Sequence, residues 1–113
     1  SVPSHCVLMK PAAEQMAIEL KNIEVTMPDV TVIQNFTAKA PASVDELINN
    51  LLAQLYSPVL WTDSVQNMIE QGVEATIECG PGKVLSGLNK KVHRPLVVAA
   101  INDAAGLEKA QGV

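Results

Sequence analysis

The stretch VEATIECGPGKVLSGLNKKVHRPLVVAAI, residues 73–101, decides the fold of this chain. Residues 73–79 have the pattern of a short β-strand, and the Gly-Pro-Gly sequence at 80–82 turns the chain sharply after it. The spacing of apolar residues predicts a helix over 83–92. Residues 96–101 are nearly all apolar, as in a strand that is buried on both faces. A strand, a helix and a second strand in this order predict an α/β fold with a mostly parallel sheet.

The first half of the chain is predicted to contain two helices and one strand. The first helix begins soon after His5, because Pro11 is tolerated only in the first turn of a helix. A short strand is expected over 30–36. The sequence Ser-Val-Asp-Glu at 43–46 is a capping box, which predicts the start of a second helix, and Pro58 ends that helix.

The second half adds two helices around the strand–helix–strand unit. One is expected over 62–71 with Gly72 as its C-terminal cap, and a last helical turn or two begins near Ala104. The residues expected to face inward from the helix over 83–92 are Val84, Leu85 and Leu88. Three strands make a small sheet, so we interpret the chain as a piece of a larger α/β layered subdomain.

Composition and charge exclude several classes of protein. The chain has 113 residues, of which 48% are hydrophobic and 3% aromatic, and its net charge is -4. Nucleic-acid binding needs positive charge and stacking rings, so no nucleic-acid partner is expected. No apolar run approaches the ~18 residues of a membrane span. The two cysteines, Cys6 and Cys79, lie far apart in the sequence, and we expect reduced thiols in a cytoplasmic protein.

Several residue patterns have a chemical and a structural interpretation, and we favour the structural one for each. The turn at 80–83 lies where phosphates bind in α/β folds, but it lacks the spacing of a P-loop or a dinucleotide fingerprint. His5, Cys6, Cys79 and His93 show no zinc-like spacing, so no metal is expected. No serine stands in a G-x-S-x-G elbow. The last pattern is a group of basic residues at the end of the helix expected over 83–92. It complements the dipole of that helix, or forms a docking patch for an acidic partner, and consists of Lys90, Lys91, His93 and Arg94.

His5 is the remaining candidate for catalysis. The Pro-Ser sequence before it predicts a turn, which places the histidine at a bend just before a helix. Catalytic side chains are often displayed at such bends. The chain itself offers no nucleophile for this histidine to activate.

Three blocks of the sequence closely resemble the C-terminal part of bacterial malonyl-CoA:acyl carrier protein transacylases. They are SVPSHCVLMKPAA at 1–13, LYSPVLWTDSV at 55–65 and ECGPGKVLSGL at 78–88, in matching order and spacing. The resemblance implies a ping-pong acyl transfer in fatty acid biosynthesis. A serine in a G-H-S-L-G elbow takes malonyl from coenzyme A, and the acyl group then passes to the phosphopantetheine thiol of acyl carrier protein.

The resemblance assigns roles to two residues of this chain. The histidine of the V-P-S-H-C block is the general base of the family, which places that role on His5. Its partner in the family is a backbone carbonyl carried by the glutamine of the Q-L-Y-x-P-V-x-W block, here Gln54. No cofactor is implied, because the coenzyme A thioester is a substrate. The expected partners are malonyl-CoA and acyl carrier protein, with no nucleic acid and no membrane.

The resemblance also implies parts that these residues do not contain. The serine nucleophile, the arginine that receives the malonyl carboxylate and a small ferredoxin-like subdomain have no counterpart here. We therefore expect residues 1–113 to be the C-terminal segment of the large, hydrolase-like subdomain of a three-layer, mostly parallel-sheet acyltransferase. Such a segment should be inactive on its own.

Two alternatives remain open at this point. One is an acyltransferase domain of a polyketide or fatty-acid synthase, although Ser4 and the sequence CVLMKPAA favour the free-standing bacterial type. The other is a non-catalytic module that keeps only the docking of the carrier protein. A G-H-S-L-G motif in the sequence upstream of residue 1 would support an enzyme, and its absence the docking module.

Overall fold

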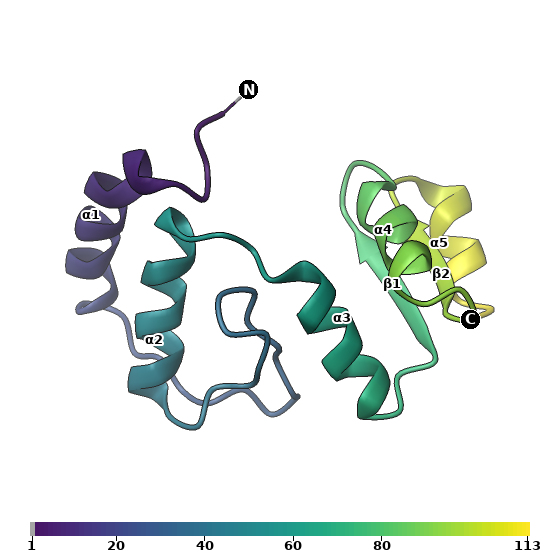
Figure 1. Ribbon diagram of the computed structural model, residues 1–113, viewed down its shortest axis with the longest axis horizontal. Helices are drawn as coiled ribbons and strands as arrows, with labels where there is room; N and C mark the ends of the chain where they lie inside the picture. The colour runs from purple at the N-terminus through teal and green to yellow at the C-terminus, as the bar shows by residue number, and fades with distance from the viewer. Residues whose placement is uncertain (1) are drawn as a thin grey trace. The chain divides into compact units, whose positions relative to one another are not determined.

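The structure, a computed structural model, describes residues 2–113; Ser1 lies outside the described residues. The chain divides into two compact units, Ser1–Ser64 and Val65–Val113. Figure 1 shows three helices, α1, α2 and α3, along the first two thirds of the chain and the two strands near its end.

The first unit is helical. A 3₁₀ turn, η1 (Val7–Met9), leads into α1 (Lys10–Leu20), and α2 (Val44–Ala53) continues into a second 3₁₀ turn, η2 (Gln54–Tyr56). Pro11 lies in the first turn of α1, as predicted, where its missing N–H leaves no helical hydrogen bond unmade. α1 packs against both α2 and η2.

The predicted capping box at the start of α2 is confirmed. The Ser43 hydroxyl accepts a hydrogen bond from the Glu46 N–H at 3.2 Å. The Glu46 carboxylate in turn accepts from the N–H of Ala42 at 3.1 Å, one residue before the cap. Two donors at the helix start are thereby satisfied by side chains, which fixes where α2 begins.

The predicted strand over 30–36 is wrong. Gln34 forms only an isolated antiparallel bridge with Lys39, and the chain between them turns through Ala38 at a positive φ of 58°. The side chain of Gln34 donates to the carbonyl of Leu47 at 3.0 Å and accepts from Asn50 at 2.7 Å. This segment is therefore tied to α2 by buried amide groups, and the described part of the chain forms a sheet of two strands where three were expected.

The second unit contains the sheet. The helix α3 (Trp61–Glu70) is capped by Gly72, which has a φ of 92°. The Gly72 N–H donates to the carbonyl of Ile69 and the Val73 N–H to that of Met68, which together form a Schellman motif. The predicted cap is thus confirmed. The chain then enters β1 (Ala75–Cys79).

The strand–helix–strand unit predicted over 73–101 is confirmed. β1 pairs in parallel with β2 (Val97–Ile101), with Ala75 opposite Val97 and Cys79 opposite Ile101. α4 (Val84–Val92) connects the two strands and contacts both, and α5 (Ala104–Ala110) packs on β2. Asp103 caps α5 by accepting from the Gly106 N–H at 2.7 Å.

Burial in this unit differs from the prediction. β2 is half-buried, and Val97 is 48% exposed. On α4, Val84 is 73% exposed, and Ser86 and Asn89 are buried in place of the predicted apolar residues. Hydrogen bonds account for this difference. Asn89 donates to the Thr76 hydroxyl at 3.1 Å, and Ser86 bonds to Glu78, so α4 faces β1 through hydrogen bonds.

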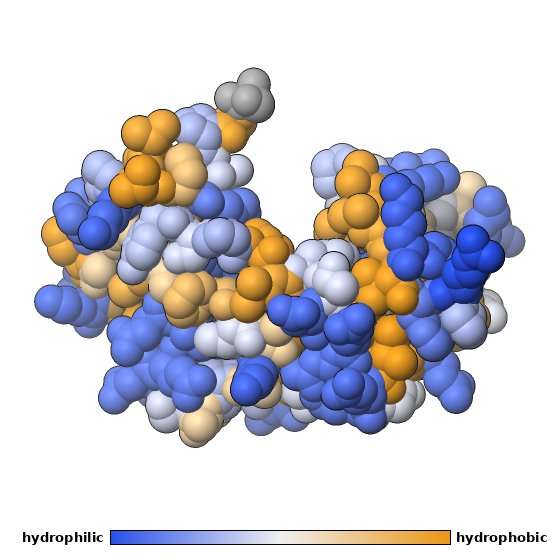
Figure 2. Space-filling view, in the orientation of Figure 1, coloured by the Kyte–Doolittle hydropathy of each residue, from blue (hydrophilic) through white to orange (hydrophobic). Residues whose placement is uncertain are grey.

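Large apolar side chains are also exposed in both units, and orange patches mark such surface in Figure 2. The buried apolar residues among those described are Ala13, Ala38, Val65, Leu96 and Ala110. Exposed apolar side chains on this scale, with so small a core, are typical of a surface that other protein covers.

Candidate active site

His5 lies in the left-handed region of backbone space, with a φ of 56°. Non-glycine residues there carry about 1–3 kcal/mol of strain and cluster at functional sites. Local hydrogen bonds hold the turn: the Ser4 N–H donates to the carbonyl of Val2 at 2.8 Å, and the thiol of Cys6 lies 3.3 Å from the carbonyl of Pro3. The side chain of His5 is exposed, so its ring is accessible to a second reactant.

The structure brings His5 and Gln54 together, although 49 residues separate them in the sequence. Nδ1 of His5 lies 2.8 Å from the backbone oxygen of Gln54. A carbonyl oxygen can only accept, so Nδ1 carries the proton in this contact. The neutral ring then has its free lone pair on Nε2, which is the form that a general base requires.

The end of α2 explains why the Gln54 carbonyl can accept this bond. Gln54 is the C-terminal cap residue of α2 and the first residue of η2. In a continuing α-helix its carbonyl would accept from the N–H of residue 58, but residue 58 is proline and has none. Pro58, which was predicted to end the helix, thus also leaves this carbonyl without the donor that an α-helix would supply.

In the hydrogen bonds of the described residues, no carboxylate takes the place of Gln54 beside His5. A carboxylate that accepts several hydrogen bonds lies elsewhere. Glu78 on β1 accepts from the Ser86 N–H at 2.8 Å, the Ser86 hydroxyl at 2.9 Å and the Leu85 N–H at 3.3 Å. The Ser86 N–H is the main cause that lowers the pKa of Glu78; partial burial opposes it, and the other two donors add to it. This carboxylate caps the start of α4, whose own N-cap residue, Lys83, makes no side-chain capping hydrogen bond.

Sequence reasoning missed this cap. The available signal was the pair of polar residues, Ser86 and Asn89, three positions apart in the part of the helix where the other residues are Val, Leu and Gly.

One of the basic residues at the end of α4 makes a local side-chain contact. Lys90 donates to the carbonyl of Arg94 at 3.1 Å, and both Lys90 and Lys91 lie in the last turn of the helix. This arrangement is the dipole-complementing one that the sequence favours.

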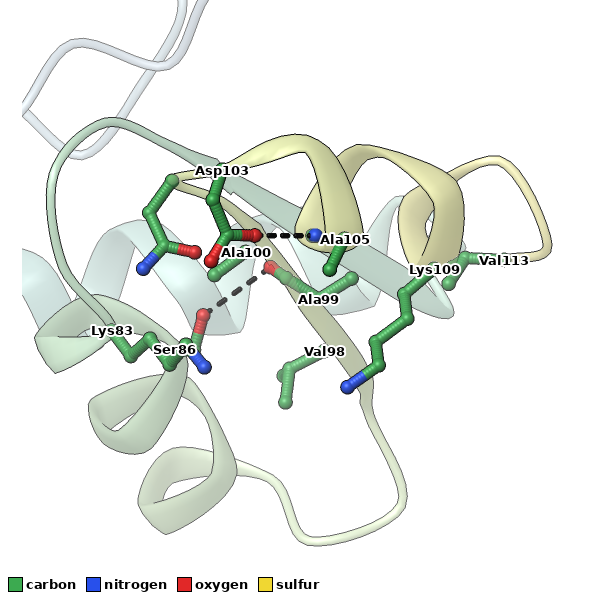
Figure 3. Close-up of a pocket in the computed structure, with 11 residues that line it drawn as sticks. Lys83, Ser86, Val98, Ala99, Ala100, Asp103, Ala105, Lys109 and Val113 are labelled. Atoms are coloured by element: carbon green, nitrogen blue, oxygen red, sulfur yellow. Dashed lines mark hydrogen bonds between the residues drawn. The ribbon is translucent and has the colours of Figure 1, made fainter.

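The second unit contains a cavity of about 340 Å³ beside β2 (Figure 3). Lys83 and Lys109 lie on opposite sides of it, Ser86 is directed at the carbonyl of Ala99 at 3.3 Å, and Asp103 caps α5 at its rim. Neither His5 nor Gln54 lines this cavity.

Within residues 2–113, no group of three or more His, Cys, Asp or Glu side chains is placed to hold a metal ion. None of the helices in that range combines the length and the apolar character needed to cross a membrane.

Comparison with solved structures defines the class of protein. The chain superimposes on an acyl carrier protein S-malonyltransferase from Vibrio cholerae with a TM-score of 0.88 and 47% identity, covering 97% of this chain and 36% of that one. A malonyl-CoA:acyl carrier protein transacylase from Xanthomonas oryzae gives a TM-score of 0.90 at 38% identity, with 97% and 35% covered. The fold is that of a segment of an α/β acyltransferase.

The sequence relatives narrow the class to one family. The chain is 49% identical over 105 residues to the malonyl CoA-acyl carrier protein transacylase of Haemophilus influenzae, covering 93% of this chain and 34% of that protein. It is 46% identical over 110 residues to the Escherichia coli K12 protein of the same name, with 97% and 36% covered. No protein-family profile matches the chain. The chain belongs to the malonyl CoA-acyl carrier protein transacylase family and spans about a third of the length of these curated relatives.

Proposed function

We propose that this chain is the part of a malonyl CoA-acyl carrier protein transacylase that supplies the general base. The observation that carries the proposal is the 2.8 Å contact between His5 Nδ1 and the carbonyl of Gln54, in a chain that belongs to this family. The reaction transfers malonyl from coenzyme A to the thiol of acyl carrier protein. The serine that carries malonyl between the two substrates belongs to a part of the protein that residues 1–113 do not contain.

His5 acts on that serine through Nε2. The ring accepts the hydroxyl proton as the oxygen attacks the malonyl thioester carbonyl, and it returns a proton to the departing coenzyme A thiolate. During the first step the ring becomes an imidazolium, whose Nδ1–H donates a charge-assisted hydrogen bond to the Gln54 oxygen. In the second half-reaction the same ring takes the proton of the carrier thiol.

The proposal includes the place of this segment in the enzyme. Residues 1–113 form the C-terminal segment of the large α/β subdomain, and the nucleophile and the ferredoxin-like subdomain come from the rest of the protein. The exposed apolar side chains of α4, such as Val84, support a location under other parts of the same polypeptide. Acyl carrier protein as partner is supported by a similar chain (TM-score 0.88, 46% identity, 97% of this chain and 36% of that one covered) that is described as a malonyl-transacylase in complex with an acyl-carrier protein.

A cytoplasmic location and the lack of a cofactor belong to the same proposal. Cys6 and Cys79 are both free, as thiols are in a reducing compartment. The thioester of coenzyme A supplies the activated acyl group, so the chemistry needs only the base and the nucleophile.

Single-turnover transfer in the full-length enzyme tests the proposal. His5→Ala should slow formation of the malonyl-enzyme from radiolabelled malonyl-CoA by at least ~10²-fold, the low end for a positioned base. His93→Ala, which removes the other histidine of the chain, is the matched control and should leave the rate near wild type. Wild-type turnover in the His5 variant at neutral pH would refute the assignment.

A further inference from the structure

A cation–ring contact spans the same two segments as the bond between His5 and Gln54. The ammonium nitrogen of Lys10 lies 5.9 Å from the centroid of the Tyr56 ring, within the range of a cation–π interaction. Lys10 opens α1, five residues after His5, and Tyr56 closes η2, two residues after Gln54. The chain is thus bridged twice between its start and the end of α2.

The packing around these two bridges is thin. Val7 and Leu8, two of the three apolar residues of η1, are each 70% exposed, so they bury little surface against η2; Met9, the third, is half-buried. Ala13 is the buried residue of α1, one turn further along. Polar and ring contacts therefore have an unusual share in setting the distance between the start of α1 and η2.

We infer that Lys10 and Tyr56 are positioning residues for the general base. Their contact holds η2 against the start of α1, so that the Gln54 carbonyl stays within hydrogen-bond distance of His5 Nδ1. When the contact between Lys10 and Tyr56 is lost, the imidazole ring of His5 can turn away from the orientation in which its Nε2 meets the serine hydroxyl. Proton transfer depends steeply on such placement, because small displacements of reacting groups reduce the rate strongly. This inference rests on the proposed role of His5.

The test is a double-mutant cycle in the full-length enzyme. Lys10→Met removes the charge and keeps the chain length, and Tyr56→Leu removes the ring and keeps apolar bulk. Each should lower the rate of malonyl-enzyme formation about two- to fivefold, with little change in KM for malonyl-CoA. The double variant should be no slower than the slower single variant, because both remove the same contact.

Conservative variants separate positioning from general loss of structure. Lys10→Arg keeps the cation and Tyr56→Phe keeps the ring, so both should retain the wild-type rate. Lys21→Met, at the other end of the same helix, is the matched control for loss of a lysine. If the two residues had a purely structural role, the single variants would have lower thermal midpoints. The conservative variants would then not restore the rate, and the loss would not be confined to kcat.

The outcomes distinguish this inference from the proposed function. If His5→Ala abolishes transfer but Lys10→Met and Tyr56→Leu leave the rate unchanged, or if their effects simply add, the positioning role is overturned and the general base stands. If His5→Ala retains wild-type transfer, both are overturned. Rate losses that Tyr56→Phe and Lys10→Arg fail to rescue also overturn the positioning role.

Discussion

Gly106 and Gly87 allow the same substitution to be compared in two helices of the second unit. A Cβ built on Gly106, in the first turn of α5, would collide with the backbone oxygen of Ala100, and it would lie 3.2 Å from Asp103 Oδ1. A Cβ on Gly87, in α4, would meet nothing within 4 Å. Replacing glycine by alanine in an open helix stabilises it by about 1 kcal/mol.

The expected effects therefore have opposite signs. Gly87→Ala should raise the free energy of unfolding by up to about 1 kcal/mol. At Gly106 the obstacle is a strand backbone that cannot rotate away, and overpacking of this kind costs about 1–3 kcal/mol. After the gain of about 1 kcal/mol from helix propensity, the net loss is up to about 2 kcal/mol. The collision also separates α5 from the end of β2, which should expose that strand to solvent.

Amide hydrogen exchange measured by mass spectrometry on the full-length protein reads this difference locally. Peptides that cover β2 and α5 should exchange about tenfold faster in Gly106→Ala, since 1.4 kcal/mol corresponds to a factor of ten. The same peptides should be unchanged or slower in Gly87→Ala. Equal protection in the two variants would show that α5 does not approach β2 as closely as the geometry requires.

Three further predictions concern the helix ends. Ser43→Ala removes the cap of α2 and should lower the free energy of unfolding by about 1 kcal/mol, measured by urea denaturation. The pKa of Glu78 is lowered, so this carboxylate stabilises the fold above its unfolded pKa, and the contribution is lost as pH falls through its folded pKa. Glu78→Gln should therefore remove this dependence of the thermal midpoint on acidic pH. An unchanged pH profile in that variant would contradict the prediction. Gln54→Ala should transfer malonyl nearly as fast as wild type, because the contact is made by the backbone, whereas Ser57→Pro should be severely impaired, because Ser57 has a φ of -124° and proline requires about -65°.

The elements that were predicted correctly are those whose ends are decided locally. The capping box at Ser43, the glycine cap at Gly72 and the proline at position 11 act within one helical turn, so neighbouring residues are enough to place them. The same holds for the strand–helix–strand unit, whose turn and spacing lie within a single continuous stretch.

The errors arose where a polar side chain outside the predicted element decides the structure. Residues 30–36 have strand-like composition, but Gln34 bonds to Leu47 and Asn50 on α2, and no local pattern contains that information. On α4, hydrophobicity predicted an apolar inner face, whereas Ser86 is held inward by Glu78. Buried polar pairs of this kind override the hydrophobic pattern because leaving one partner unbonded is costly.

The candidate site combines both kinds of information. That Pro58 frees a carbonyl at the end of α2 follows from the sequence, and so does a turn before His5. That the two meet does not follow from local pattern, since their contact spans 49 residues and needs a positive φ at His5. The family resemblance supplied the pairing; the geometry adds its chemical consequence. A carbonyl partner fixes the tautomer of the ring as a carboxylate would, but it brings no negative charge to the imidazolium. In the mechanism that we propose, the base therefore relies on orientation, and the segments that hold Gln54 in place matter to the rate together with the histidine's own surroundings.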